Sequence, residues 1–284
     1  MDILRGILGI TFIIIVAFLF SEHKKNIPWK TVGIGIGIQI LLAFVIINPL
    51  EVSILEYFRK GFDLLGKGFV HILDFSKDGT KFLFGSFLDT EKHGFLFAFQ
   101  VLPTIIFFSA ITSVLFYFGI IQKIVHFLAL LMTKILKLSG AESLSVAGNI
   151  FLGQTESPLM IKAYLPKMSR SEILLVMTGG MATIAGGVFA AYVALLGGVD
   201  NVDSVKFATI LLTASIMNAP AGIVLSKIFI PESRKEINKN LNISSEDLGS
   251  NAIHALAKGA SDGLKLALNI AAMLLAFLAF VYMI

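Results

Sequence analysis

A short polar segment between residues 138 and 161 carries the side chains best suited to bind a solute. Four of them are two amides, a hydroxyl and a carboxylate, on Asn149, Gln154, Thr155 and Glu156. Amide and hydroxyl groups donate and accept hydrogen bonds, and an ionised carboxylate accepts them. Brought together, these side chains could hold the polar groups of a small molecule.

A second segment, Met177 to Val188, is rich in glycine and threonine, with four Gly and two Thr in twelve residues. Each Gly weakens a helix interior by up to about 1 kcal/mol relative to Ala. We therefore expect unwinding around Thr183 to Gly187, which would free carbonyl oxygens to hold a hard cation such as sodium. A packing role stays open, because Gly179, Thr183 and Gly187 are spaced by four and would form a small-residue stripe.

The composition indicates an integral membrane protein. Of 284 residues, 56% are apolar (AVILMFWYC) and 15% are charged, and the mean hydropathy is +0.85; soluble domains have about 25% charged residues. Disorder and nucleic-acid binding are excluded. With no Cys, there is no disulfide framework or thiolate metal site. The five His are scattered without metal-ligand spacing, and G-x-S-x-G, Walker A and HExxH motifs are absent. No enzymatic activity and no organic cofactor are expected.

Long uncharged runs predict the membrane spans, since a spanning helix needs about 20 mostly apolar residues. Six runs qualify: Gly6 to Ser21, Thr31 to Leu50, Gly94 to Gln122, Ile173 to Val199, Phe207 to Ser226 and Leu266 to Ile284. The fold class predicted is an all-α integral membrane protein with about six transmembrane helices.

The distribution of basic residues predicts the orientation. They gather after the first, third and fifth runs, as Lys24, Lys25 and Lys30, as Lys123, Lys134 and Lys137, and as Lys227, Arg234, Lys235 and Lys239. The loop from Asp200 to Lys206 has two acids and one base. Cytoplasmic loops carry an excess of Lys and Arg, so the amino terminus is expected outside a cell (inner) membrane that the chain crosses several times.

Residues 51–93 mix charges with apolar side chains at helical spacing, namely Ile54, Leu55, Phe58, Phe62 and Leu65. This pattern is typical of amphipathic helices lying at the membrane interface. A solvated amphipathic linker fits the same pattern.

The polar segment has lysines on both sides, Lys134 and Lys137 before it and Lys162 and Lys167 after it. If both flanks are cytoplasmic, the chain enters and returns on one side as a re-entrant helical hairpin with its tip near residues 153–156. Non-helical backbone at membrane depth must line a cavity or be buried in protein. An ionisable Glu156 at that depth would mark a functional site. The other interpretation is a polar cytoplasmic loop with Glu156 in solvent.

Three motifs resemble the concentrative nucleoside transporter family. They are Gly148-Asn-Ile-Phe-Leu-Gly-Gln-Thr-Glu-Ser-Pro158, the Met177 to Gly187 segment, and Ala260-Ser-Asp-Gly-Leu-Lys-Leu-Ala-Leu-Asn-Ile-Ala-Ala-Met-Leu-Leu-Ala-Phe277. They occur in the order that this family has, and the resemblance extends over essentially the whole chain.

The resemblance implies a symporter that takes nucleosides into the cell with sodium, or in some members protons, by an elevator-like alternating-access movement of a homotrimer. It implies that Gln154, Thr155 and Glu156 bind the nucleobase and that Val188 packs near the substrate. It places sodium at the side chains of Asn149 and Thr183 and at the carbonyls of Leu152, Thr183 and Ile184. Some relatives have Ser where this chain has Thr183, and Thr keeps the hydroxyl oxygen, which favours sodium over protons.

The resemblance also divides the chain into parts. They are two scaffold helices in 1–50, interfacial helices in 51–93, a scaffold helix in 94–122, a first transport repeat in 123–228, a cytoplasmic linker in 229–263 and a scaffold helix in 264–284. Within the repeat we expect the hairpin at about 141–166, the interrupted helix at 172–199 and a helix at 206–227.

The length departs from the family, whose members usually have about 400 residues and a second repeat with another hairpin. We therefore expect the chain to be an amino-terminal portion that carries the base-binding and cation half of the site. Two other hypotheses stay open: a truncated membrane scaffold or interaction subunit that does not transport, and a related gate-domain permease for another solute.

Overall fold

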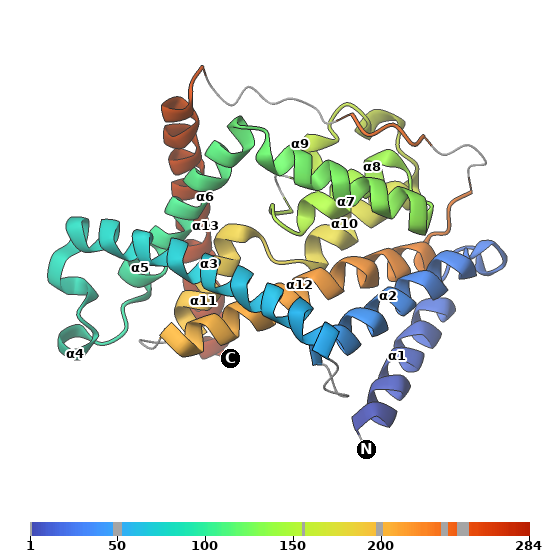
Figure 1. The fold of residues 1–284 in the computed structure, drawn as a ribbon, viewed down its shortest axis with the longest axis horizontal. Helices are drawn as coiled ribbons and strands as arrows, with labels where there is room; N and C mark the ends of the chain where they lie inside the picture. Colours follow the sequence, from blue (N-terminus) through green and yellow to red (C-terminus); the bar gives the residue numbers. More distant parts are fainter. Residues whose placement is uncertain (1, 48–52, 155–156, 197–200, 234–237, 243–249) are drawn as a thin grey trace. The chain divides into compact units, whose positions relative to one another are not determined.

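The computed structural model describes residues 2–47, 53–154, 157–196, 201–233, 238–242 and 250–284, and within them the regular elements are all helical (Figure 1). The helices of eight or more residues are α1 (Asp2–Leu19), α2 (Trp29–Ile47), α3 (Ser53–Phe84), α6 (Leu102–Tyr117), α7 (Ile120–Leu136), α8 (Gly140–Asn149), α10 (Arg170–Ala182), α11 (Gly186–Leu196), α12 (Asn201–Phe229) and α13 (Ala252–Met283). Short helical turns are η1 (Lys24–Asn26), η2 (Gly85–Leu88), α4 (Thr90–His93), α5 (Phe97–Gln100), α9 (Ser157–Met160) and η3 (Leu165–Lys167).

Five helical segments among the described residues are long and apolar enough to cross a membrane: Trp29–Ile46, Phe97–Tyr117, Arg170–Leu196, Ser204–Phe229 and Ala252–Met283. Arg5–Leu19 is a shorter apolar helix. The chain is thus an all-α, multi-pass membrane protein. The predicted span of 94–122 is not one continuous helix, since Val101 separates α5 from α6 and Gly119 ends the segment with a φ of 73°.

The chain forms two compact units. The first comprises Met1–Val52, Ile124–Ile184 and Ala214–Glu246, and the second comprises Ser53–Lys123, Ala185–Thr213 and Asp247–Ile284. The first unit therefore joins the two leading helices to the polar segment and to the end of α12.

Two apolar clusters hold the first unit together. Ala17, Val32 and Ile228 belong to the cluster that joins α1, α2 and α12. The second cluster joins α7, α8, α10 and α12 and consists of Leu136, Leu138, Val146, Leu175, Ala219 and Ile223. Every residue of α8 is buried. This burial is what a polar helix needs if it is to lie at membrane depth, because protein and not lipid then surrounds its polar groups.

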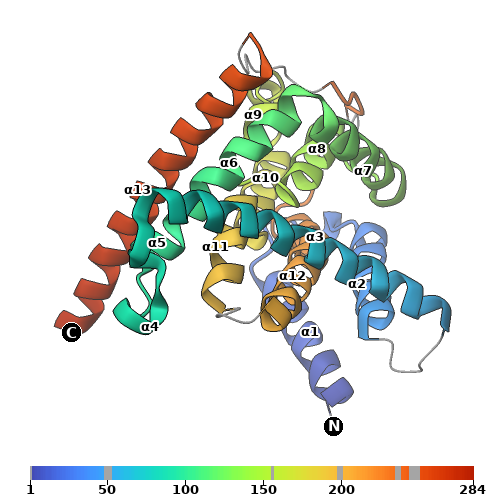
Figure 2. The same cartoon turned by 60° about the vertical axis from the view of Figure 1, so that its left-hand side comes forward.

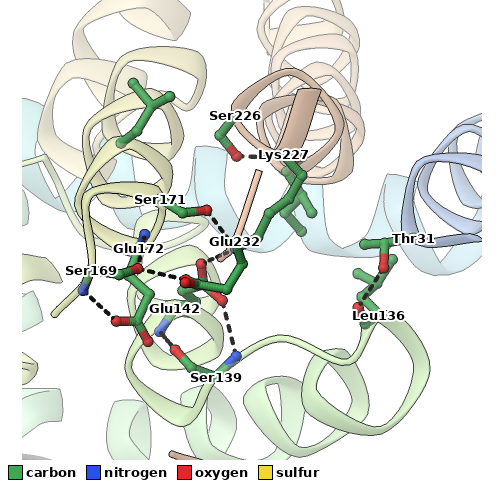
Figure 3. A network of polar contacts seen from close by, with 12 residues as sticks. Thr31, Leu136, Ser139, Glu142, Ser169, Ser171, Glu172, Ser226, Lys227 and Glu232 are labelled. Atoms are coloured by element: carbon green, nitrogen blue, oxygen red, sulfur yellow. Dashed lines mark hydrogen bonds and ion pairs between the residues drawn. The ribbon is translucent and has the colours of Figure 1, made fainter. Parts of the chain in front are cut away.

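A buried ionic network joins the starts of α8 and α10 to the end of α12 (Figure 3). Lys227 on α12 donates to the Glu142 carboxylate and, at 3.1 Å, to the Ser171 hydroxyl. Glu142 also closes a capping box with Ser139, in which each side chain bonds to the other residue's backbone N–H. Lys227 is only 5% exposed, so it is not a loop charge. The prediction that Lys227 is a loop charge is therefore wrong, while its place on the cytoplasmic side stays a prediction.

Small residues bring α13 against α6 in the second unit, where the two helices lie side by side in both views (Figure 1, Figure 2). The buried residues of α13 are Ala255, Gly259, Gly263 and Ala267, which repeat every four positions. A Cβ on Gly259 would lie 2.5 Å from the Cβ of Ser113. Close backbone approach of this kind is typical of membrane helix pairs.

The helix α13 begins earlier than predicted. It starts at Ala252, whereas the sequence analysis placed residues 229–263 in a linker and began the helix at 264. The charges at Lys258, Asp262 and Lys265 hid the helical pattern. The four small buried residues supply the packing against α6 that extends the helix.

The amphipathic region 51–93 contains one long helix, α3, followed by η2 and α4. Phe69 on α3 contacts two aromatic rings of the same unit, Phe108 on α6 with ring centroids 4.5 Å apart and Phe189 on α11 at 4.3 Å. Other large apolar side chains of α3 are exposed, and Phe82 is 90% exposed. One face of α3 therefore packs on the protein, and apolar groups elsewhere on the helix are available to lipid.

The segment with Lys123 and Lys134 is helical as well. Both lysines, predicted to be loop charges, lie in α7. The apolar side chains of α7 that pack inward include Val125 and Ala129, which are fully buried. These residues are four apart, the spacing of one helix face.

Candidate functional site

The polar segment reverses direction between α8 and α9. Ser157, at the start of α9, donates its hydroxyl hydrogen to the carbonyl oxygen of Ser145 on α8 at 2.7 Å. A Cβ on Gly148 would lie 2.9 Å from the Ser157 Oγ, so glycine allows the two arms to approach. The hydrogen bond and the close approach hold the intervening turn, which carries Leu152 and Gln154. The second arm is short, because only Ser157–Met160 forms an α-helical turn.

Asn149, the last residue of α8, has a fully buried side chain with neither amide atom hydrogen-bonded in the described part of the chain. Its Nδ2 faces Gly179 of α10, where an added Cβ would lie 3.2 Å away. Most buried polar side-chain atoms have a partner, so a buried amide without one calls for an explanation. A bound cation that contacts the Oδ1 would supply one.

The apolar segment formed by α10 and α11 is interrupted between the two helices, at Thr183–Ala185. This break lies inside the stretch where the glycine content predicts unwinding. Thr183 has an extended backbone with φ −109° and ψ 160°. The last carbonyls of α10 lack the donors that a continuous helix would supply. The Thr183 hydroxyl donates to the Gly179 carbonyl at 2.8 Å.

Gly179 and Gly180 are the place where the predicted site residues meet. Gly179 lies against Asn149 and accepts the hydrogen bond of Thr183. An added Cβ on Gly180 would lie 2.8 Å from the Cβ of Gln154 and 3.9 Å from the Asn149 Oδ1. Both glycines are buried. The two glycines therefore form the surface of α10 against which the hairpin turn packs. This contact is more specific than the small-residue packing stripe that the sequence also allowed.

The remaining predicted residues are placed as follows. Leu152 is 2% exposed and its N–H donates to the Gly148 carbonyl at 2.7 Å. Ile184 lies in the helix break. Val188 lies on α11, which belongs to the second compact unit, and is partly buried. Thr155 and Glu156 lie outside the described residues.

Three serines of the site were missed by the sequence analysis: Ser145, Ser157 and Ser215. Ser215 on α12 accepts a hydrogen bond from the Ile184 N–H at 3.4 Å, and Ser145 and Ser157 close the hairpin. All three are almost completely buried. A signal for Ser145 and Ser157 was present, since each lies in a segment of small and polar residues near Asn149. Ser215 lies within an apolar run and gave no such signal.

The site contains neutral oxygens that can hold a hard monovalent cation. Its candidate ligands are the Asn149 amide, the Thr183 hydroxyl and backbone carbonyls at the hairpin turn and the helix break. Broken helices bind sodium through groups of this kind. Among the described residues no cluster of three or more His, Cys, Asp or Glu could hold a metal ion. The donor set thus fits sodium better than a transition metal, which prefers nitrogen and sulfur ligands.

Three family models match successive parts of the chain. "Na+ dependent nucleoside transporter N-terminus" matches residues 8–87, "Nucleoside recognition" matches 98–199, and "Na+ dependent nucleoside transporter C-terminus" matches 210–284. Together they cover the leading helices, the hairpin with the helix break, and α12 with α13.

Curated proteins and solved structures give the same result. An uncharacterized transporter of Haemophilus influenzae is 38% identical over 100% of this chain and 65% of its own length. Sodium/nucleoside cotransporter 1 of Mus musculus is 38% identical over 95% of this chain and 39% of its own length. The structure of CNTnw in an inward-facing substrate-bound state has a TM-score of 0.88 and 34% identity, covering 100% of this chain and 67% of CNTnw.

The chain spans about two thirds of the length of its bacterial relative and of CNTnw. The three family models follow one another in the order of the sequence, and the helical fold matches over the entire chain. The relatives are transporters, so the chain is not an enzyme. From these matches, this chain belongs to the concentrative Na+-dependent nucleoside transporter family.

Proposed function

We propose that the protein is a sodium-coupled nucleoside symporter of which this chain carries the base-binding and cation half of the site. The observation that carries the proposal is the side chain of Asn149, which is fully buried, has no hydrogen-bond partner in the described residues, and lies beside a helix break. Family membership supports sodium as the ion and nucleosides as the substrate class.

The proposed sodium ligands are the side chains of Asn149 and Thr183 and the carbonyls of Leu152, Thr183 and Ile184. Full burial beside Gly179 supports Asn149 as a ligand. Thr183 is partly buried, and its hydroxyl lies 2.8 Å from the carbonyl of the same glycine. A bound sodium ion would supply positive charge to these neutral oxygens and draw the hairpin turn and the helix break together.

The proposed nucleobase ligands are Gln154, Thr155 and Glu156, with Val188 packing near the substrate. An amide, a hydroxyl and a carboxylate provide the donors and acceptors that the edge of a nucleobase requires. The Cβ of Gln154 lies close to Gly180, but the residue as a whole is exposed. It is therefore free to meet a ligand.

Coupling then follows from the shared turn. Leu152 and Gln154 are two residues apart, so ordering the turn through the Leu152 carbonyl also orders the base-binding side chains. If sodium raises nucleoside affinity by some factor, nucleoside raises sodium affinity by the same factor. Symport needs this reciprocity.

The remaining features of the proposal come from the family resemblance and from the charge distribution. We propose about six membrane spans with a re-entrant hairpin at residues 141–166, interfacial amphipathic helices in 51–93, a homotrimer and an elevator-like movement. The scaffold helices would be those of residues 1–50, those of 94–122 and α13, which includes the predicted residues 264–284 and begins at Ala252. The amino terminus would lie outside an inner or plasma membrane. Proton coupling is the less favoured mode, because Thr183 keeps a hydroxyl at the cation site.

Uptake of radiolabelled uridine tests the proposal. The protein encoded by the complete reading frame that contains this sequence is reconstituted in proteoliposomes, and an inward sodium gradient is compared with choline and with a proton gradient. We expect uptake only with sodium. Uptake driven by protons alone would contradict the choice of ion. Absence of uridine uptake under every gradient would favour a permease for another solute or a scaffold that does not transport.

A further inference from the structure

We propose that Ser215 is a positioning residue for the cation site: by accepting the Ile184 N–H it fixes the direction of the Thr183 carbonyl, a proposed sodium ligand. The inference rests on the proposed function and deepens it. It adds a residue of α12 to a site that was otherwise attributed to the hairpin and the broken helix.

The first step is the state of the Ile184 N–H. In a continuous helix it would donate to the carbonyl four residues earlier. The break at Thr183–Ala185 removes that acceptor, and the N–H instead donates to the Ser215 Oγ at 3.4 Å. Ser215 is 2% exposed, so water does not substitute for it readily.

The second step is the rigidity of the peptide group. The Ile184 N–H and the Thr183 carbonyl belong to one planar trans peptide, in which the N–H and C=O bonds point in opposite directions. No peptide bond in the described chain is cis. Fixing the N–H toward Ser215 on α12 therefore fixes the Thr183 carbonyl away from α12.

Gly179 connects α12 to the other proposed side-chain ligand, Asn149. Gly179 of α10 has α12 on one side, where an added Cβ on Gly222 would lie 3.7 Å from the Gly179 Cα. An added Cβ on Gly179 would also lie 3.2 Å from the Asn149 Nδ2, so Gly179 is close to both α12 and Asn149. Ser215 and Gly222 are seven residues apart, or two helical turns, so both are on the face of α12 that meets α10. Because the Thr183 carbonyl and the Asn149 side chain are both proposed sodium ligands, holding this carbonyl in one direction preserves the set of ligands that the ion would meet.

The structure offers a matched control on the same helix. Ser226 of α12 is fully buried like Ser215, but its hydroxyl donates to a carbonyl of its own helix, that of Ile223, at 3.0 Å. Replacing Ser226 removes a buried hydroxyl of the same kind without releasing the helix break.

The experiment uses the chain purified into lipid nanodiscs and measures the rise of its melting temperature with sodium, with choline chloride holding the ionic strength constant. Ser215→Ala should raise the sodium concentration needed for a given rise of the melting temperature by roughly ten-fold, the effect of one lost hydrogen bond of ordinary strength. Ser215→Cys, which keeps the size but accepts hydrogen bonds weakly, should shift it in the same direction. Ser226→Ala should leave it unchanged.

The outcomes separate this inference from the proposed function. If Ser215→Ala and Ser215→Cys respond to sodium at the same concentrations as the unmodified chain, the role of Ser215 is overturned and the proposed function still stands. An equal shift in Ser226→Ala would also overturn it, since any buried hydroxyl would then have the same effect. A chain that does not respond to sodium at all would reject the cation site itself, and the role of Ser215 with it.

Discussion

Lys227 and Glu142 form a buried ion pair, with the Lys227 Nζ 2.5 Å from the Glu142 Oε1 and side chains 6% and 2% exposed. The two residues are far apart in the sequence and join the end of α12 to the start of α8, the helix that ends in Asn149 (Figure 3). The Ser171 hydroxyl, at 3.1 Å from the same Nζ, adds the start of α10. One lysine thus anchors the three helices that build the candidate site.

The first prediction concerns this anchor. Glu142→Gln or Lys227→Met should each destabilise the protein by about 3–5 kcal/mol, because removing one partner leaves the other charge buried and unpaired. The melting temperature in detergent, measured by intrinsic fluorescence, checks it. The double variant should cost less than the sum of the two single variants, since no lone charge remains.

Lys60→Gln is the matched control for the anchor. Lys60 pairs with Glu56 at 2.9 Å, but both side chains are more than half exposed, at 66% and 56%. Exposed pairs contribute about 0–1 kcal/mol. A Lys227→Met variant as stable as Lys60→Gln would show that the buried pair does not hold these helices together.

The second prediction separates binding from stability at Asn149. Because its amide has no hydrogen-bond partner in the described structure, Asn149→Ala should change the melting temperature little without sodium. It should abolish the stabilisation by sodium, which at 100 times the dissociation constant amounts to about 2.7 kcal/mol for one site. Melting curves with and without sodium decide the matter. A full sodium response in Asn149→Ala would remove this residue from the cation site.

The third prediction concerns the glycines beneath the hairpin turn. Gly180→Ala places a Cβ 2.8 Å from the Gln154 Cβ, so the turn must shift, and we expect a loss of nucleoside affinity of at least about ten-fold. Gly222→Ala is the control, since its nearest neighbours would lie at 3.7 Å, an ordinary contact distance. Calorimetric titration with uridine in sodium buffer measures both variants. Equal affinities would show that the turn is not held by this contact.

The sequence predicted the parts of the site that local chemistry controls. The glycine content of Met177 to Val188 indicated a helix interruption, and the structure has one at Thr183–Ala185. Lysines around the polar segment indicated a re-entrant hairpin; the structure shows a reversal that Ser157 closes against Ser145, and entry and return on one side of the membrane stays a prediction. Composition alone was sufficient to indicate a multi-pass helical membrane protein.

The parts that depend on distant contacts could not be predicted in this way. Nothing near Lys227 in the sequence shows that it meets Glu142, since the pair forms only when α8 and α12 pack together. Ser215 resembles any small residue of an apolar helix until the break places the Ile184 N–H beside it. The early start of α13 likewise depends on α6, because Gly259 and Gly263 of α13 pack closely against that helix.

The fourth prediction tests the base-binding carboxylate. Glu156→Gln keeps the size of the side chain but replaces an acceptor that carries charge with a neutral amide. A hydrogen bond to a charged group contributes about 1.5–3 kcal/mol, so nucleoside affinity should fall by roughly ten-fold to a hundred-fold or more. Calorimetry with uridine, on the protein from the complete reading frame, measures this change. The sodium-induced rise in melting temperature should persist, because Glu156 is not among the proposed sodium ligands. This rise also serves as the control that the variant is folded. Unchanged uridine affinity in a variant that still responds to sodium would contradict the role of Glu156 while leaving the cation site intact.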